Sequence, residues 1–155
     1  MKRLTELSLV LVFTFGILMI AGCRPAKDTR VVEKEENRIV LRTGEGESVT
    51  VSMNSGELPE GWPPEIPVLP GGKLVFAQAG SKKNIRQINI EVKKPRVETF
   101  DFYMDRLDSA GWDVQTTMKL TGMYVATAKK GGEELILQVS DREQGVTHVQ
   151  IIVRL

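Results

Sequence analysis

The residue types that most often carry chemistry are scarce in this chain of 155 residues, which contains one cysteine, Cys23, and one histidine, His148. A zinc site uses three or four ligands, usually several cysteines or histidines. His148 lies in the alternating stretch VTHVQIIV, so we interpret it as a strand residue that faces water or a neighbouring side chain. A Ser-His-Asp triad needs a nucleophile held in an exposed turn, and the sequence has no Gly-x-Ser-x-Gly elbow. We therefore predict no catalytic residue, no metal and no cofactor.

Paired carboxylates are the remaining candidates for acid–base chemistry. Glu35 and Glu36 lie in a charged segment, while Glu133 and Glu134 open a predicted strand, where adjacent side chains point to opposite faces. The stretch GEGESV has the glycines of a phosphate-binding loop but lacks its Gly-Lys-Ser/Thr ending and a following helix, so it indicates a hairpin turn. These patterns favour a protein that is not an enzyme.

The first 22 residues have the layout of a secretory signal peptide. Lys2 and Arg3 precede a mostly apolar run over 7–20, and two small residues follow it. The apolar run is shorter than the roughly 20 residues that span a bilayer. The tetrapeptide Ile-Ala-Gly-Cys at 20–23 resembles the bacterial lipobox, which implies a diacylglyceryl thioether on Cys23, cleavage before Cys23, and acylation (palmitate, for example) of the new amino terminus. The alternative is an uncleaved anchor with an incidental cysteine.

Lipidation of Cys23 would place the protein in the bacterial cell envelope. Two or three acyl chains hold a protein stably on a bilayer, whereas a single chain binds only marginally. The residue after Cys23 is Arg24. Because an aspartate there commonly retains lipoproteins in the inner membrane, its absence favours the outer membrane facing the periplasm in a Gram-negative cell. The predicted partners are therefore the lipid bilayer, through Cys23, and an envelope protein.

Charge and length point to one domain without a nucleic-acid partner. Removing Lys2, Arg3 and Glu6 from the 21 basic and 20 acidic residues leaves 19 of each in the mature chain. A nucleic-acid-binding domain would show a basic excess. Cleavage leaves 133 residues, which is enough for one domain, and the sequence leaves the oligomeric state open.

The predicted domain covers 38–155, and its main body begins at residue 73. Three segments precede this main body: 23–37, 38–53 and 54–72. Residues 23–37 are highly charged and lack periodicity, so we predict the lipidated cysteine and a tether; a short helix over 31–37 is the alternative, but it would have no apolar face. RIVLRT and SVTVSM predict a hairpin over 38–53. The segment 54–72 holds five of the seven prolines, which exclude a helix or a central strand. Its apolar residues, including Trp62 and Ile66, should pack on the domain; Trp62 is either a core-edge plug, which we favour, or a partner anchor.

The remaining residues, 73–155, predict the order ββαββββ. One amphipathic helix over about 95–110 should begin near Pro95 without a good N-cap and end at Gly111. Phe100, Tyr103 and Trp112 are predicted core residues, whereas Phe102 lies off the apolar stripe. The predicted fold class is α+β, a two-layer domain with one main helix packed on an antiparallel sheet, preceded by the hairpin and the proline-rich crossing.

Three stretches of the chain resemble a group of small bacterial envelope lipoproteins of unassigned function: LPEGWPPEIPVLPGGKLV, FYMDRLDSAGWDV and the terminal GVTHVQIIV. Members of this group carry a Pro-x-Gly-Trp/Phe-Pro…Pro-Gly segment and a Phe-Tyr-x₃-Leu-x₃-Gly-Trp helix end. The resemblance covers about 38–155 and implies fold and location, with no catalytic residues. The helix followed by GWDV and a meander has a looser likeness to the helix-grip domains of a lipoprotein in the β-barrel assembly machinery, which is a fold-level analogy.

Three functions follow from these observations. We favour a membrane-anchored, non-catalytic module that docks an envelope protein or an assembly complex. The first alternative is a periplasmic carrier of a small apolar ligand or lipid, held between helix and sheet; the second is an enzyme with a dispersed carboxylate and histidine site. An exposed apolar patch around the proline segment would favour the module, and an apolar pocket above about 300 Å³ would favour the carrier.

Overall fold

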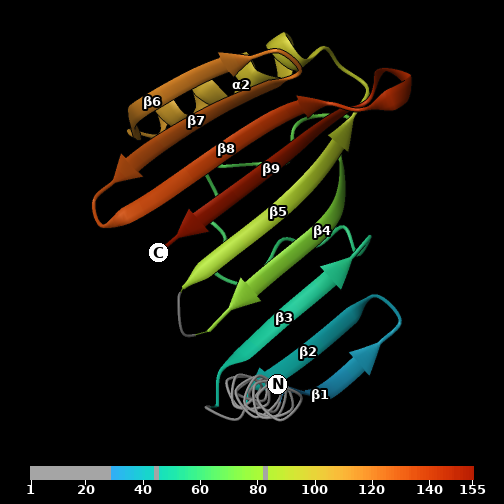
Figure 1. Ribbon diagram of the computed structural model, residues 1–155. Helices are drawn as coiled ribbons and strands as arrows, with labels where there is room; N and C mark the ends of the chain where they lie inside the picture. Colours follow the sequence, from blue (N-terminus) through green and yellow to red (C-terminus); the bar gives the residue numbers. More distant parts are fainter. Residues whose placement is uncertain (1–28, 44–45, 82–83) are drawn as a thin grey trace, which may run out of the picture.

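A single antiparallel sheet of nine strands dominates the computed structural model, which describes residues 29–43, 46–81 and 84–155. The strand order is β1-β2-β3-β4-β5-β9-β8-β7-β6 (Figure 1). The strands are β1 (Thr29–Glu35), β2 (Arg38–Thr43), β3 (Ser48–Met53), β4 (Lys73–Gly80), β5 (Ile85–Val92), β6 (Asp113–Leu120), β7 (Met123–Lys130), β8 (Glu133–Asp141) and β9 (Thr147–Arg154). The helices in this part of the chain are α2 (Arg96–Ser109) and a short 3₁₀ turn, η1 (Glu143–Gly145).

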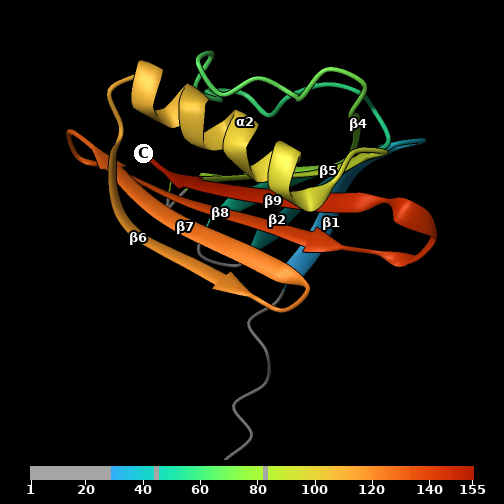
Figure 2. The same ribbon diagram turned by 90° about the horizontal axis from the view of Figure 1, so that it is seen from above.

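The predicted two-layer α+β class is wrong. The protein is mostly β, with one continuous open sheet in which α2 is a single addition of 14 residues. The helix lies along one face, mainly against β6, β7 and β8, as Figure 2 shows. The prediction failed because it treated the first hairpin as a separate unit. In the structure β3 pairs with β4, Val49 opposite Gly80, and so extends the same sheet by three strands.

The order of elements after residue 72 was predicted correctly, as β4, β5, α2 and then β6 to β9. The start of α2 has no side-chain cap, as the two lysines before Pro95 suggested. Its end is fixed by Gly111 at φ +78°, where a side chain would be strained. The Gly111 amide donates to the Asp108 carbonyl and the Trp112 amide to the Leu107 carbonyl, each at 2.9 Å, which is the Schellman arrangement.

The core lies on the face of the sheet that carries α2, here called the helix face. Strand β9 shows the alternation clearly, since Thr147, Val149, Ile151 and Val153 are buried while the residues between them are not. Helix residues close this core from above, as the sequence predicted: Phe100, Tyr103, Leu107 and the following Trp112. Burial of these large side chains is the main stabilising contribution to the fold.

Residues 29–35 form β1, so the predicted tether is wrong for that stretch. The segment TRVVEKE pairs along β2, with Val31 opposite Leu41 and Lys34 opposite Ile39. All seven side chains of β1 are exposed. The predicted hairpin of β2 and β3 is confirmed, whereas the leader, Cys23 and the residues up to 28 lie outside the described part.

The proline-rich segment 54–72 contains no strand or helix and crosses the helix face, as predicted (Figure 2). Three contacts hold it there, and a fourth hydrogen bond is internal to the segment. The internal bond runs from the Trp62 indole to the Ile66 carbonyl at 2.7 Å. The Leu69 amide donates to the Tyr103 hydroxyl on α2 at 3.2 Å. The Arg86 guanidinium donates to the Glu60 carbonyl at 2.5 Å. Lys130 on β7 pairs with Glu65 at 2.8 Å.

Candidate binding surfaces

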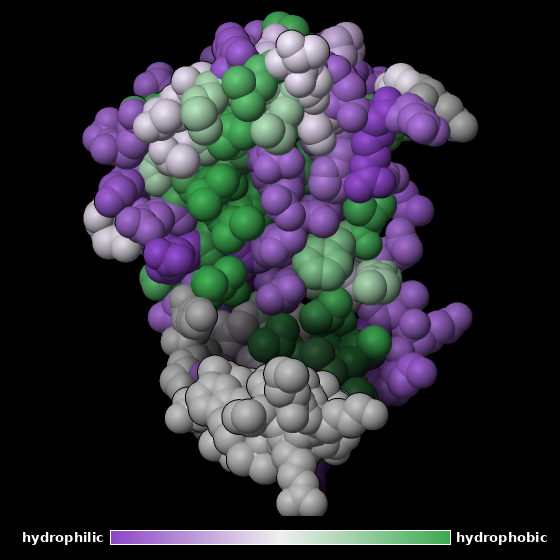
Figure 3. Space-filling view, viewed as in Figure 1, coloured by the Kyte–Doolittle hydropathy of each residue, from purple (hydrophilic) through white to green (hydrophobic). Residues whose placement is uncertain are grey.

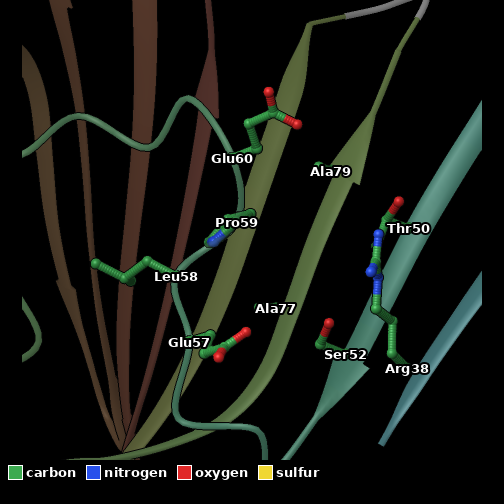
Figure 4. Close-up of a pocket in the computed structure, with 9 residues that line it drawn as sticks. All are labelled: Arg38, Thr50, Ser52, Glu57, Leu58, Pro59, Glu60, Ala77 and Ala79. Atoms are coloured by element: carbon green, nitrogen blue, oxygen red, sulfur yellow. The ribbon is translucent and has the colours of Figure 1, made fainter. Parts of the chain in front are cut away.

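A cleft of about 300 Å³ separates the start of the proline-rich segment from β2, β3 and β4 (Figure 4). Its floor exists because four small side chains occupy adjoining positions on the helix face. Ser52 lies opposite Ala77 and Thr50 opposite Ala79 across the β3–β4 pair. Leu58 and Pro59 of the proline-rich segment complete the wall on the other side. The hollow is therefore built by the register of β3 and β4.

The walls of this cleft carry charges of both signs. Arg38 extends from β2 on one side, with its guanidinium beside Thr50, and the Glu57 and Glu60 carboxylates lie on the proline-rich segment (Figure 4). None of these three side chains forms an ion pair within the described residues. They are exposed, so their charges remain accessible to a ligand that enters the cleft.

The opposite face of the sheet, here called the outer face, carries two groups of apolar side chains (Figure 3). The β2–β4 patch consists of Ile39, Leu41, Val49, Val51, Met53 and Phe76. The β6–β9 patch consists of Met118, Leu120, Met123, Val125, Ile136 and Ile152. An amide band lies between the patches and consists of Gln78, Gln87, Asn89, Gln138 and Gln150.

Both outer-face patches hold strongly exposed apolar side chains, Met53 at 53% in the β2–β4 patch and three residues in the β6–β9 patch. Met118, Leu120 and Ile136 are 47%, 52% and 45% exposed. Single exposed apolar residues are ordinary, but a contiguous group marks an interaction surface. The charges beside the β6–β9 patch are balanced locally, because Glu134 pairs with both Lys129 at 3.1 Å and Arg154 at 3.0 Å, and Asp113 lies opposite Lys129 in the β6–β7 register. Both basic groups hold the pKa of the Glu134 carboxyl below its usual value, Lys129 with the larger effect.

Trp62 and Ile66, the two site residues singled out in the proline-rich segment, are both buried, at 8% and 1% exposure. They contact the core cluster and each other through the indole hydrogen bond. This supports the core-edge interpretation of Trp62 over the partner anchor. The third predicted site residue, Cys23, lies outside the described residues.

His148 does not meet a cluster of carboxylates. It faces the outer side of the sheet between Glu91 on β5 and Ser140 on β8. Partial burial lowers its pKa, and the nearby Arg142 lowers it further, while Glu91 acts in the opposite direction. Within the described residues no group of three or more histidine, cysteine or acidic side chains could hold a metal ion. Glu133 and Glu134 are on neighbouring strand positions and are not brought together with His148.

The space between α2 and the sheet is filled by side chains. Phe100, Tyr103 and Leu107 on the helix are no more than 2% exposed, and so are Leu137 and Ile151 beneath them. Tyr103 is buried deeply enough that desolvation raises the pKa of its hydroxyl to about 12. The hollow that the sequence suggested for an apolar ligand is therefore occupied by the core itself.

The four small residues of the cleft and the β6–β9 patch were not found by reading the sequence. For the patch a signal was present: Ile136 stands between Leu135 and Leu137, which makes β8 apolar on both faces. For the cleft there was none, since Thr50, Ser52, Ala77 and Ala79 meet only through the β3–β4 register.

Comparison with known proteins gives one match, to a family model described as START domain-like, over residues 74–145. The match runs from β4 through β8 and includes α2. No curated protein and no solved structure matches the chain. Strands β2 and β3 and the proline-rich segment, which form most of the cleft, lie outside the matched range. No helix in the described part of the chain is long and apolar enough to cross a bilayer.

Proposed function

We propose that this protein is a lipid-anchored, non-catalytic interaction module of the bacterial envelope, which docks an envelope protein on the β6–β9 patch. The observation that carries the proposal is the exposure of Met118, Leu120 and Ile136 on one face of the sheet. Met118 and Leu120 lie on β6 and Ile136 on β8, and Val125 on β7 connects them, opposite Met118 and diagonal to Ile136. Apolar side chains grouped in this way are stabilised when a partner removes them from water, at about 25 cal/mol per Å².

A protein partner fits this surface better than the bilayer itself. A membrane-adhering face usually adds basic residues to its apolar ones. Here the two cations, Lys129 and Arg154, are accompanied by two carboxylates: Glu134 pairs with both cations, and Asp113 lies opposite Lys129. The amide band beside the patch offers hydrogen-bond donors and acceptors, which an acyl-chain surface cannot satisfy. A partner protein can satisfy these groups at the rim of an apolar contact, which is the usual anatomy of an interface.

The proposal is tested by placing one lysine in the patch. Ile136→Lys and Met118→Lys change half-exposed side chains, so the fold should be retained, while a charge inside the interface should weaken binding at least tenfold. Ser109→Lys, at the exposed end of α2, introduces the same charge elsewhere and serves as the control. Crosslinked complexes isolated from the native envelope should contain one partner with wild type and Ser109→Lys that is missing with both patch variants. Equal recovery in all four proteins, or recovery of only a second copy of this chain, would refute the proposal.

A carrier of an apolar ligand is the second candidate, because a START domain-like match is compatible with ligand binding. The filled space between α2 and the sheet opposes it. We expect a fluorescent fatty acid to show no saturable binding to the purified protein. Saturable binding that is lost when the core is narrowed, as in Ala126→Leu under α2, would favour the carrier instead.

A further inference from the structure

The cleft between the proline-rich segment and β2–β4 is independent of the docking surface, because it opens on the helix face. We propose that it binds a small zwitterion of dipeptide size, with the ligand carboxylate at Arg38 and the ligand ammonium at Glu57 and Glu60. The volume of about 300 Å³ lies at the lower end of the range for ligand pockets. This volume is too small for a long acyl chain. It suits a short ligand that has only a few non-hydrogen atoms beside each of its charged groups.

The charge arrangement determines the ligand class. Arg38 and the two glutamates stand on opposite walls (Figure 4) and have no ion-pair partners within the described residues. A guanidinium binds a carboxylate through paired N–H donors, and a carboxylate accepts hydrogen bonds from an ammonium group. A ligand with only one charge would leave the opposite wall without a partner. A zwitterion satisfies both walls at once.

The floor determines what can lie between the two charged groups. Ala77 is buried and Ala79 half-buried, and both side chains end in a methyl group. Thr50 and Ser52 add hydroxyls that can donate to or accept from a peptide group. The middle of the ligand should therefore combine a peptide bond with small apolar side chains, such as those of alanine.

The cleft is rigid enough to be formed before the ligand arrives. The Arg86 guanidinium fixes the Glu60 carbonyl from β5, and donates a second hydrogen bond to the Gly80 carbonyl at 3.2 Å. The wall is further anchored by Trp62, whose side chain is buried in the core cluster. Preformed walls reduce the ordering entropy that a ligand must offset on binding.

The test uses full-length protein in mild detergent and calorimetric titration with alanyl-alanine. Two analogues remove one charge each: the N-acetyl dipeptide lacks the ammonium, and the dipeptide amide lacks the carboxylate. We expect the free dipeptide to bind wild type at least tenfold more tightly than either analogue, because each lost charge-assisted hydrogen bond is worth about a factor of ten.

Variants then assign each end of the ligand to a wall. Arg38→Gln should bind the dipeptide and its amide equally, and the double variant Glu57→Gln/Glu60→Gln should bind the dipeptide and its N-acetyl form equally. Arg106→Gln and Glu143→Gln, exposed and remote from the cleft, should keep the wild-type preferences. Wild type that binds no dipeptide, or binds all three compounds with one affinity, would overturn the proposal. Because the patch lysine variants should bind the dipeptide normally, failure here is distinguishable from failure of the docking proposal.

Discussion

Single side chains explain why the proline-rich segment is a structural wall. Trp62 is 8% exposed, and its indole N–H donates to the Ile66 carbonyl within the same segment. The sequence predicted this role because prolines restrict the unfolded chain and apolar residues give the segment something to bury. What it could not show was the partner atoms, such as the Tyr103 hydroxyl that accepts from Leu69.

Replacing Trp62 with alanine should destabilise the protein by about 3–5 kcal/mol, the usual loss when a buried large aromatic is truncated. Trp62→Phe should cost less, because it keeps most of the buried surface and removes only the hydrogen bond to Ile66. Denaturant unfolding of the three proteins measures both effects. A loss of stability below about 1 kcal/mol for Trp62→Ala would contradict the core-edge interpretation of Trp62.

The single histidine should make stability depend on pH. Partial burial lowers the pKa of His148 from its ordinary value of 6.5 in the folded protein. The unfolded chain therefore takes up this proton at a higher pH than the folded protein does. Stability should fall as the pH drops below about 6.5 through the folded-state pKa, and should be regained as the pH rises. The unfolding midpoints of wild type and His148→Gln should differ more and more as the pH falls through this range. Parallel curves would contradict a lowered pKa of His148 in the folded protein.

Among the helices and strands, the sequence correctly predicted those whose position is determined by a local pattern of residues. Alternation defined the β2–β3 hairpin, and glycine ended α2 at the observed residue. It missed β1, because TRVVEKE is charged and entirely exposed, so no buried face marks it as a strand. It also missed the union of the first hairpin with the main sheet, since β3 and β4 pair across the whole proline-rich segment and no local signal encodes that contact.

A chain that begins at Arg38 should fold cooperatively without β1. That strand pairs with β2 alone and contributes no residue to the core cluster. Removing it should therefore lower the unfolding midpoint only slightly, although β2 becomes the new edge of the sheet. Circular dichroism melts with and without a chelator would measure this. Loss of cooperative unfolding would show that β1 is required, and a chelator effect would reveal a metal.

In the whole molecule, the proposed lipid anchor would be combined with two separate binding surfaces. If Cys23 carries the lipid, five residues separate it from β1, and the six residue steps from Cys23 to Thr29 reach about 20–22 Å when extended. The sheet would then stand close to the bilayer by its β1 edge, with the β6–β9 patch at the far end of the strand order. This arrangement would present the patch to a partner away from the membrane surface.

The anchor itself is tested by Cys23→Ser. Serine has no thiolate for the lipid donor, so the variant should remain unprocessed and unlabelled when cells are grown with a tagged fatty acid. Wild type should take up the label and lose the 22-residue leader, which mass spectrometry of the amino terminus would detect. Equal labelling of both proteins would contradict the lipoprotein assignment.

Site-specific photo-crosslinking tests most directly whether the β6–β9 patch meets a partner protein in the envelope. A photo-reactive amino acid in place of Ile136, 45% exposed on the outer face, should give one discrete adduct with another protein in intact cells. The same residue in place of Ser109 on α2 should not give it, and Met118→Lys should abolish the adduct formed from position 136. Adducts that are identical from both positions, or that contain only lipid or a second copy of this chain, would contradict the account.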